Sequence, residues 1–161
     1  MNNETIDRTL IDKTGWGEGP WSDEPDRIEW EHAGLPCLMV RHERLGHWCG
    51  YAAVPPGHPL HGKDYDDVFD WDKNADYNWP HGGLTYASLC SHNVCHVPKP
   101  GEPEDVFWFG FDCAHCDDFS PGMTALLRES MPRFRDETYR EVPYVQAETN
   151  RLAAFLSEVA A

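Results

Sequence analysis

The feature that most constrains this chain is a strongly apolar run, Val106 to Phe111, which leads directly into a cluster of acids, thiols and an imidazole that ends at Asp118. Side chains two residues apart on a β-strand point to the same side, so the run divides into two faces. The face that we expect to lie in the core carries Phe107, Phe109, Phe111 and Cys113. The opposite face carries Val106, Trp108, Gly110 and Asp112. We therefore expect the core and a candidate site to meet at the end of this strand.

Gly110 has two interpretations on the second face. Because it has no side chain, it leaves a gap between Trp108 and Asp112 that a ligand or another backbone segment could enter. The alternative is ordinary packing, in which a loop covers that face of a central strand. The sequence leaves both interpretations open.

Length and composition indicate one globular domain. A chain of 161 residues and 18.4 kDa can bury a core without disulfide or metal support. Seven Trp and seven Phe residues exclude a disordered acidic chain. The net charge of −15 argues against nonspecific binding to duplex DNA, RNA or an anionic membrane. This charge is explained by solubility, or by an acidic surface that docks on a basic host protein.

The sequence also predicts a compartment. It contains no apolar run near the roughly 18 residues needed to span a bilayer, and its first residues are too polar for a secretory signal. We therefore expect a cytoplasmic protein without a membrane span. There the six cysteines are expected to be mostly reduced thiols or metal ligands. Four of them are expected to be buried as small apolar side chains, namely Cys37, Cys49, Cys90 and Cys113.

Residues 1–34 are expected to form an arm packed on a domain that spans residues 35–161. The arm has few periodic apolar positions, but Trp16, Trp21 and Trp30 can pin it to the domain. Residues 27–32 within it can add a short edge strand.

The clearest local prediction is a β-hairpin. Two β-prone runs, residues 35–42 and 47–54, are split by Glu43-Arg-Leu-Gly46. A further strand over residues 81–90 follows a Gly-Gly turn. If it pairs antiparallel with the strand at 106–112, the start of one strand lies beside the end of the other. That pairing would place His81, Gly82 and Gly83 next to Asp112 and His115.

The C-terminal part is expected to be helical. Ser120 and Pro121 can begin a short helix over residues 120–129, and Pro143 opens a final helix. The apolar residues of the final helix recur near a 3.6-residue period, at Val145, Leu152, Phe155, Leu156 and Val159. The expected fold class is α+β, with a mostly antiparallel sheet of four to five strands, packed by the C-terminal helix and rich in loops.

The candidate site is the neighbourhood of His81, Asp112 and His115. Two imidazoles and a carboxylate can bind a divalent metal such as zinc, or transfer protons near neutral pH. The amides of Gly82 and Gly83 can hold an anion if the turn forms a nest. The alternative is structural, with His81 hydrogen-bonded at a turn and Asp112 capping the loop after its strand.

A bound ligand would have a wider set of contacts. The loop over residues 55–63 could close over the cleft and supply positive charge, and Trp108 offers a ring for stacking. The predicted ligand-binding residues are His58, Lys63, His81, Gly82, Gly83, Thr85, Trp108, Asp112 and His115.

The cysteine spacings favour neither a structural zinc site nor a thiol nucleophile. Cys113 and Cys116 have ligand spacing, but the upstream pair, Cys90 and Cys95, does not complete a standard pattern. A nucleophilic Cys113 would need His115 as its base, and the two share a side only if the strand continues beyond Cys113.

Four stretches together resemble a family of small proteins common in bacteriophage and actinobacterial genomes. They are residues 50–65, His81-Gly-Gly-Leu-Thr-Tyr86, Trp108-Phe-Gly-Phe-Asp-Cys-Ala-His115 and residues 139–152. The resemblance covers about residues 45–155, and Cys116 departs from the family's pattern after His115. The family has no settled biochemical activity, so the resemblance implies a phage-type origin and, from that origin, a role in counteracting host defence.

Three functional hypotheses result. The first is a phage-type cytoplasmic accessory protein that binds a small polar ligand, such as a nucleotide or another phosphorylated compound, in the predicted cleft. The second is a metal-dependent hydrolase that uses His81, Asp112 and His115. The third is an acidic inhibitor that binds a host protein.

Overall fold

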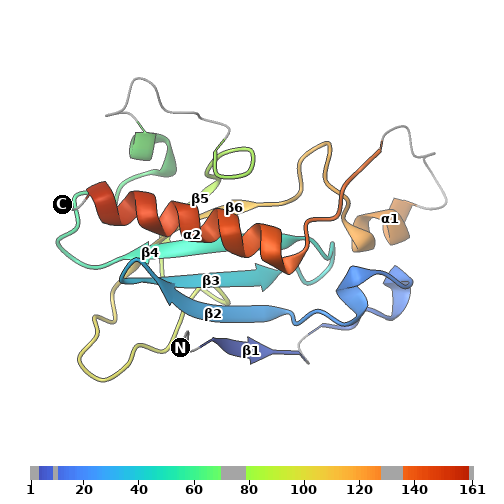
Figure 1. Ribbon diagram of the computed structural model, residues 1–161, viewed down its shortest axis with the longest axis horizontal. Helices are drawn as coiled ribbons and strands as arrows, with labels where there is room; N and C mark the ends of the chain where they lie inside the picture. Colours follow the sequence, from blue (N-terminus) through green and yellow to red (C-terminus); the bar gives the residue numbers. More distant parts are fainter. Residues whose placement is uncertain (1–3, 9–10, 70–78, 128–135, 160–161) are drawn as a thin grey trace.

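A computed structural model describes residues 4–8, 11–69, 79–127 and 136–159. It confirms the α+β class: one antiparallel sheet is packed against the C-terminal helix (Figure 1). Within the described ranges the sheet has six strands in the order β1-β2-β3-β4-β6-β5, slightly more than the four or five predicted. The strands are β1 (Thr5–Asp7), β2 (Arg27–His32), β3 (Leu35–Arg41), β4 (Trp48–Val54), β5 (Tyr86–Leu89) and β6 (Phe107–Asp112). The helices are α1 (Pro121–Leu127) and α2 (Val142–Val159), with short 3-10 helices η1 (Thr14–Trp16), η2 (Pro20–Ser22) and η3 (Tyr65–Phe69).

The long helix α2 covers one face of the sheet and crosses β4 and β3 (Figure 1). The predicted apolar stripe is confirmed, since Val145, Leu152 and Leu156 are fully buried against that face. Gly50 on β4 permits the close approach, because a side chain there would collide with Thr149 of the helix. The core therefore depends on a glycine under the helix as well as on apolar area.

The opposite face of the sheet is a second, smaller core. It contains Tyr51, Val106 and Trp108, and it is closed by Val94 from the loop between β5 and β6. The ring of Tyr51 fills the space beside Gly110, so this glycine serves packing and the gap predicted for a ligand is absent. Trp108 is completely buried here.

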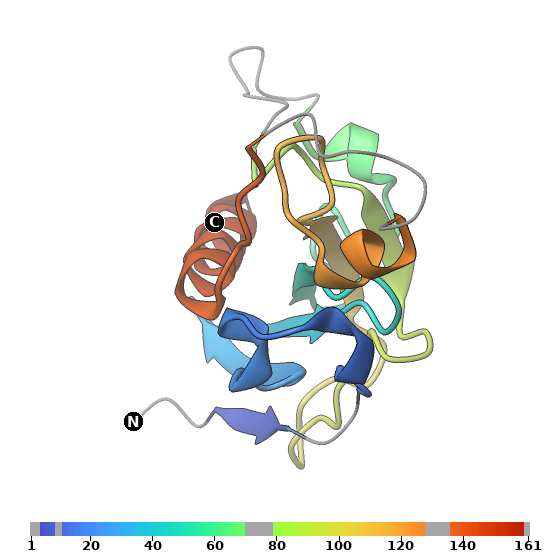
Figure 2. The ribbon, with the colours of Figure 1, turned by 90° about the vertical axis from the view of Figure 1, so that its right-hand side faces the viewer.

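The N-terminal segment contributes to the sheet itself. Strand β2 pairs with β3, and β1 pairs with its outer side, so β2 is an internal strand rather than the predicted edge strand. Trp16, Trp21 and Trp30 are all buried, and Trp30 belongs to the core under α2. The 3-10 helix η1 lies beside α1, which brings residues 14–16 to the end of the sheet where β6 stops (Figure 2).

The predicted pairings near the focal strand are confirmed. The β3–β4 hairpin is antiparallel, and β5 pairs antiparallel with β6 so that Tyr86 faces Gly110. The short helix α1 begins at Pro121, as the sequence indicated. No helix in the described part of the chain is both long and apolar enough to cross a membrane.

Candidate functional site

The end of β6 brings two imidazoles together. Pairing of β5 with β6 continues to Thr85, whose amide donates to the Gly110 carbonyl at 2.9 Å. The chain before Thr85 therefore lies beside the chain that leaves β6 at Asp112. As a result the rings of His81 and His115 lie 5.3 Å apart, centroid to centroid. The predicted neighbourhood of the Gly-Gly turn and the end of the aromatic strand thus exists.

The carboxylate at its centre is Asp118 rather than Asp112. One oxygen of Asp118 lies 2.7 Å from Nε2 of His81 and 3.0 Å from the backbone amide of His115. The other oxygen accepts from Nε of Arg140 at 2.8 Å. Only 1% of the Asp118 side chain is exposed. We call His81, His115, Asp118, Arg140 and Tyr144 the His81 cluster.

The environment of Asp118 keeps it ionised. Burial by itself would raise the pKa of this carboxyl, but hydrogen bonds from His81, Arg140 and the His115 amide outweigh burial and hold the pKa well below its usual range. The same hydrogen bond raises the pKa of Arg140. The cluster therefore contains a permanent ion pair with two imidazoles against it.

His81 is held on every side. Its Nδ1 lies 2.7 Å from the hydroxyl of Tyr144, and its backbone amide donates to Glu148 at 3.0 Å. Its φ of 24° lies in a region that residues with side chains seldom adopt, and such strain recurs at functional sites. Burial raises the pKa of Tyr144, and the Arg140 guanidinium lies 4.9 Å from the centre of its ring. The result is a continuous chain from hydroxyl to imidazole to carboxylate.

Three ligand atoms in this cluster have spacing suited to a metal ion. Nitrogens of His81 and His115 and an oxygen of Asp118 all lie within 4.8 Å of one another. Nδ1 of His115 is buried without a hydrogen-bond partner, at 3.4 Å from Asp118. Two imidazoles and one carboxylate form a donor set typical of catalytic zinc, which keeps a fourth position open.

Asp112, the predicted carboxylate ligand, has a structural role instead. Its two oxygens accept from the Thr85 hydroxyl at 2.9 Å and from the Ala114 amide at 3.1 Å. It therefore caps the turn after β6, which is the structural alternative considered above, and Thr85 contacts Asp112 rather than a ligand position. The loop after β6 folds back, and the Asp118 amide donates to the His115 carbonyl at 2.9 Å.

The Gly-Gly turn is not the predicted pair of amides for an anion. The Gly83 amide donates to the Pro80 carbonyl at 2.8 Å, so one of the two donors is already used. Gly82 has a φ of 82°, and a side chain there would collide with the ring of His115. Gly82 is thus needed to seat His115 rather than to hold an anion.

The remaining predicted ligand residues lie elsewhere. His58 is buried with its Nε2 at 2.8 Å from the Leu156 carbonyl, twelve residues along α2 from Tyr144, or about 18 Å at the helical rise. Its loop partner Lys63 is exposed and makes a turn with Leu60. Trp108 is enclosed in the second core. The structure does not bring any of these three to the His81 cluster.

The cysteines form neither a zinc site nor a nucleophile. Cys90 and Cys95 are joined in a disulfide with Cα atoms 4.7 Å apart, so the prediction that Cys90 is a buried free thiol is wrong. Cys37 and Cys113 are buried as predicted, and Cys49 is partly buried. Desolvation raises the pKa of each of these three thiols, which opposes thiolate chemistry.

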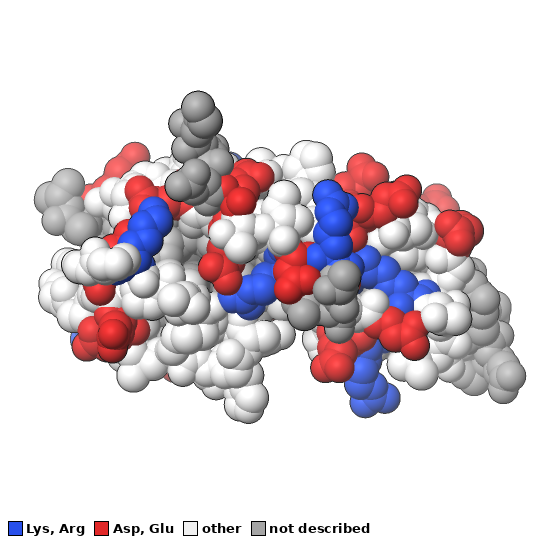
Figure 3. Space-filling model, turned by 90° about the horizontal axis from the view of Figure 1, so that it is seen from below, with Lys and Arg blue, Asp and Glu red and all other residues white. Residues whose placement is uncertain are grey.

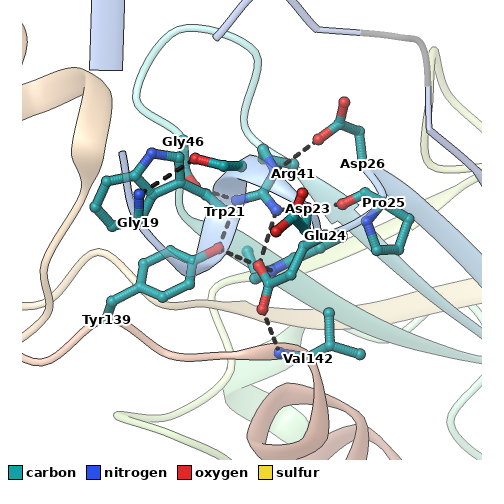
Figure 4. A network of polar contacts seen from close by, with 12 residues as sticks. Gly19, Trp21, Asp23, Glu24, Pro25, Asp26, Arg41, Gly46, Tyr139 and Val142 are labelled. Carbon is teal, nitrogen blue, oxygen red and sulfur yellow. Dashed lines mark hydrogen bonds and ion pairs between the residues drawn. The ribbon is translucent and has the colours of Figure 1, made fainter. Parts of the chain in front are cut away.

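A second polar group, the Arg41 network, adjoins the segment that carries Arg140 (Figure 4). The guanidinium of Arg41 pairs with Asp26 at 2.7 Å and with Glu24 at 3.0 Å. The hydroxyl of Tyr139 donates to the same Glu24 oxygen at 2.6 Å, and Glu24 also accepts from the Val142 amide at the start of α2. Lys13 completes the network at 2.8 Å from Asp26. This network fixes the backbone on both sides of Arg140.

Tyr144, Asp118 and Arg140 were missed by sequence reasoning. The signal for Tyr144 was its place one turn before Glu148 on the expected helix. Nothing local indicated Arg140, which meets Asp118 across 22 residues. Comparisons with protein-family models, with curated proteins and with solved structures returned no match.

Proposed function

We propose that this protein is a metal-dependent hydrolase of a small phosphorylated compound, with the His81 cluster as its active site. The observation that carries the proposal is the convergence of His81, His115 and Asp118 with one imidazole nitrogen left unpartnered. A site of this kind supplies a metal-bound water as nucleophile at neutral pH. Arg140 at its edge supplies a partner for phosphate.

The donor atoms fit a divalent ion such as zinc after a small expansion. Ligands 2.0–2.1 Å from a tetrahedral zinc lie about 3.3 Å apart, and His115 and Asp118 are already at 3.4 Å. His81 and Asp118 are closer, at 2.7 Å, because they share a hydrogen bond. A metal would replace the proton of that bond, so affinity should fall as pH falls.

The surrounding contacts match those that orient metal ligands. A histidine that binds a metal through one nitrogen usually hydrogen-bonds through the other, and Tyr144 occupies that position on His81. Arg140 fixes the second oxygen of Asp118. Its positive charge opposes a metal in the free protein, whereas an anionic phosphate bound between the two would offset this repulsion.

The test is metal content followed by activity. Protein stripped with a chelator and dialysed against zinc or manganese should retain a stoichiometric ion, measured by elemental analysis, and the metal-loaded form should release phosphate or nucleoside from a panel of nucleotides and chromogenic phosphoesters. His115→Ala should lose both. His32→Ala, at the end of β2, is the matched control and should keep both.

A metal-free protein that remains inactive with every metal would overturn the proposal. In that case a second candidate applies: a protein that sequesters a phosphorylated ligand. The specific observation in its favour is that Asp118 already holds Arg140 and His81 in place without a metal. Binding of nucleotides measured by calorimetry in the presence of a chelator, and weakened by Arg140→Met, would support it.

Either activity would suit the role in counteracting host defence that we propose from the phage resemblance, by destroying or withholding a phosphorylated signal. The acidic-inhibitor hypothesis has less support. On the surface seen in Figure 3, acidic side chains are interspersed with Lys and Arg instead of forming one continuous acidic face. This face therefore presents no continuous acidic patch to a basic partner.

A further inference from the structure

A cavity of about 600 Å³ lies on the side of the sheet opposite α2, away from the His81 cluster. Its walls are strands β2 and β3, Thr5 of the edge strand β1, and the loop that runs from His96 to Pro103. Alternation along β2 places Glu29 and Glu31 on this face, whereas Ile28 and Trp30 belong to the core under the helix. The volume falls within the range of small-molecule sites.

Carboxylates dominate the polar lining. Glu29, Glu31 and Glu102 all border the cavity. Glu29 is already paired with Arg27 at 2.6 Å, whereas Glu31 and Glu102 share the loosely held cation of Lys99, and Glu102 also accepts from the Lys99 amide at 2.9 Å. The ammonium of Lys99 lies 3.9 Å from Glu31 and 4.0 Å from Glu102, and 64% of the Lys99 side chain is exposed. The chain therefore places an ammonium group of its own between two carboxylates, on a tether that can move aside.

The remainder of the lining is apolar. Pro36 and Val106 line the wall of the cavity, and Val106 is buried. Val97 lies at its rim with 89% of its surface exposed. A ligand with an apolar body would cover Val97 and gain the corresponding hydrophobic free energy.

His96 forms part of the cavity wall. Nδ1 of His96 is buried without a hydrogen bond, and the ring packs edge-on against Trp108 at 5.4 Å. Burial lowers the pKa of His96 and so favours the neutral ring, which adds little positive charge to repel an ammonium.

We propose that this cavity is a second binding site, which takes a small organic ammonium ion with an apolar body. The ammonium lies between Glu31 and Glu102 in place of the Lys99 side chain, and the apolar part lies against Pro36, Val106 and Val97. A bare metal ion is not favoured, because the one group of three His, Cys, Asp or Glu residues with metal spacing in the described part of the chain is the His81 cluster. The inference is independent of the function proposed above.

Calorimetry with phenethylammonium, 2-phenylethanol and 3-phenylpropionate tests the proposal, because the three probes share an aromatic body and differ in charge. We expect saturable binding of the ammonium, weaker binding of the alcohol and none of the carboxylate. Amide resonances of His96 and Val97 should shift in proportion to occupancy. The double variant E31Q/E102Q should bind the ammonium about tenfold less tightly, since two exposed charge contacts are lost.

Two further variants make the result decisive. K99M should bind the ammonium more tightly than wild type, because the internal competitor is gone, which a merely destabilised protein would not do. E18Q/E43Q neutralises two exposed glutamates outside the cavity and should leave binding unchanged. The proposal is overturned by equal binding of all three probes, by no saturable binding, or by wild-type affinity in E31Q/E102Q.

Discussion

The Arg41 network and the His81 cluster are both built around a carboxylate–arginine pair, but they differ in how much of the pair is exposed to solvent. Each has a buried carboxylate that holds an arginine, at 2.7 Å for Asp26 with Arg41 and at 2.8 Å for Asp118 with Arg140. Both side chains of the first pair are fully buried, whereas Arg140 is 25% exposed. His115, beside the second pair, is 35% exposed. The Arg41–Asp26 pair is closed to solvent and contributes to the stability of the fold. The His81 cluster has an exposed edge that solvent and ligands can reach.

The two groups are covalent neighbours. Tyr139 belongs to the network, and the next residue, Arg140, belongs to the cluster. Glu24 accepts hydrogen bonds from the Tyr139 hydroxyl and from the first backbone amide of α2. The sealed group therefore holds the short segment that delivers Arg140 and Tyr144. A rigid ion network can thus position the residues of a site without contacting the ligand.

The largest expected effect is in the network. Arg41→Met should lower the free energy of unfolding by about 3–5 kcal/mol, because Glu24 would lose its cation and the buried Asp26 would be left with Lys13. Urea unfolding at pH 7 measures the change. Arg44→Met, on the exposed turn between β3 and β4, should change it by less than about 0.5 kcal/mol. Equal effects in the two variants would show that the network is not the sealed support described.

A buried histidine between the two groups gives the next effect. Desolvation, followed by the influence of His42, lowers the pKa of His47 to about 4, with Asp112 and Asp118 opposing the change and Arg41 adding to it. The unfolded value is about 6.5, so the unfolded chain binds the proton first as pH falls. The contribution of neutral His47 to the free energy of unfolding is fully present above about pH 6.5. It is lost as the pH falls toward 4, and the total loss is about 3 kcal/mol.

His47→Gln removes this titration. Between pH 7 and pH 4 the wild type should lose about 3 kcal/mol more than the variant in urea unfolding, apart from the change shared by both proteins. Parallel pH profiles would contradict the burial of a neutral ring at this position.

How much of this was predictable depends on the range of the interaction. The hairpin, the apolar stripe of α2 and the pairing of β5 with β6 follow from periodicity and turn residues, and the meeting of His81 with His115 follows from that pairing. Asp118 could not be assigned in place of Asp112, since the choice depends on how the loop after β6 folds back.

Other failures have the same origin in tertiary contacts. Whether the gap at Gly110 admits a ligand depends on Tyr51, which comes from the neighbouring strand. The Cys90–Cys95 disulfide depends on a turn in which Ser91 and Val94 form a bridge, and the cysteine spacing does not specify that turn. A strand pattern indicates which face a residue occupies, but not which side chain from another strand covers it.

Tyr139 in the Arg41 network and Tyr144 in the His81 cluster allow a matched test of the difference between the two groups. Tyr139→Phe removes hydrogen bonds at 2.6 Å to both Arg41 and Glu24 and should cost about 2 kcal/mol of unfolding free energy. Tyr144→Phe removes one contact of a partly exposed hydroxyl and should cost less than about 0.5 kcal/mol. Metal affinity should show the opposite order, with Tyr144→Phe about 10–100-fold weaker. Unfolding curves and metal titrations of both variants decide the point.

The smallest effect on stability is expected at His115. Its ring is partly exposed and its Nδ1 has no hydrogen bond to lose, so His115→Ala should alter the free energy of unfolding by less than about 1 kcal/mol. A loss of unfolding free energy as large as that of Arg41→Met would mean that the His81 cluster has a structural role as well. Thermal and urea unfolding of the metal-free protein provide the measurement.

The grip of α2 on His81 has a thermodynamic consequence. Tyr144 and Glu148 are one helical turn apart, and both hold the same histidine, one by its ring and one by its backbone amide. An ion bound to His81 therefore also stabilises the packing of α2 against the turn before β5. By linkage, an ion present at a hundred times its dissociation constant would add about 2.7 kcal/mol to the stability of the whole domain, so resistance to heat becomes a gauge of whether the centre is filled.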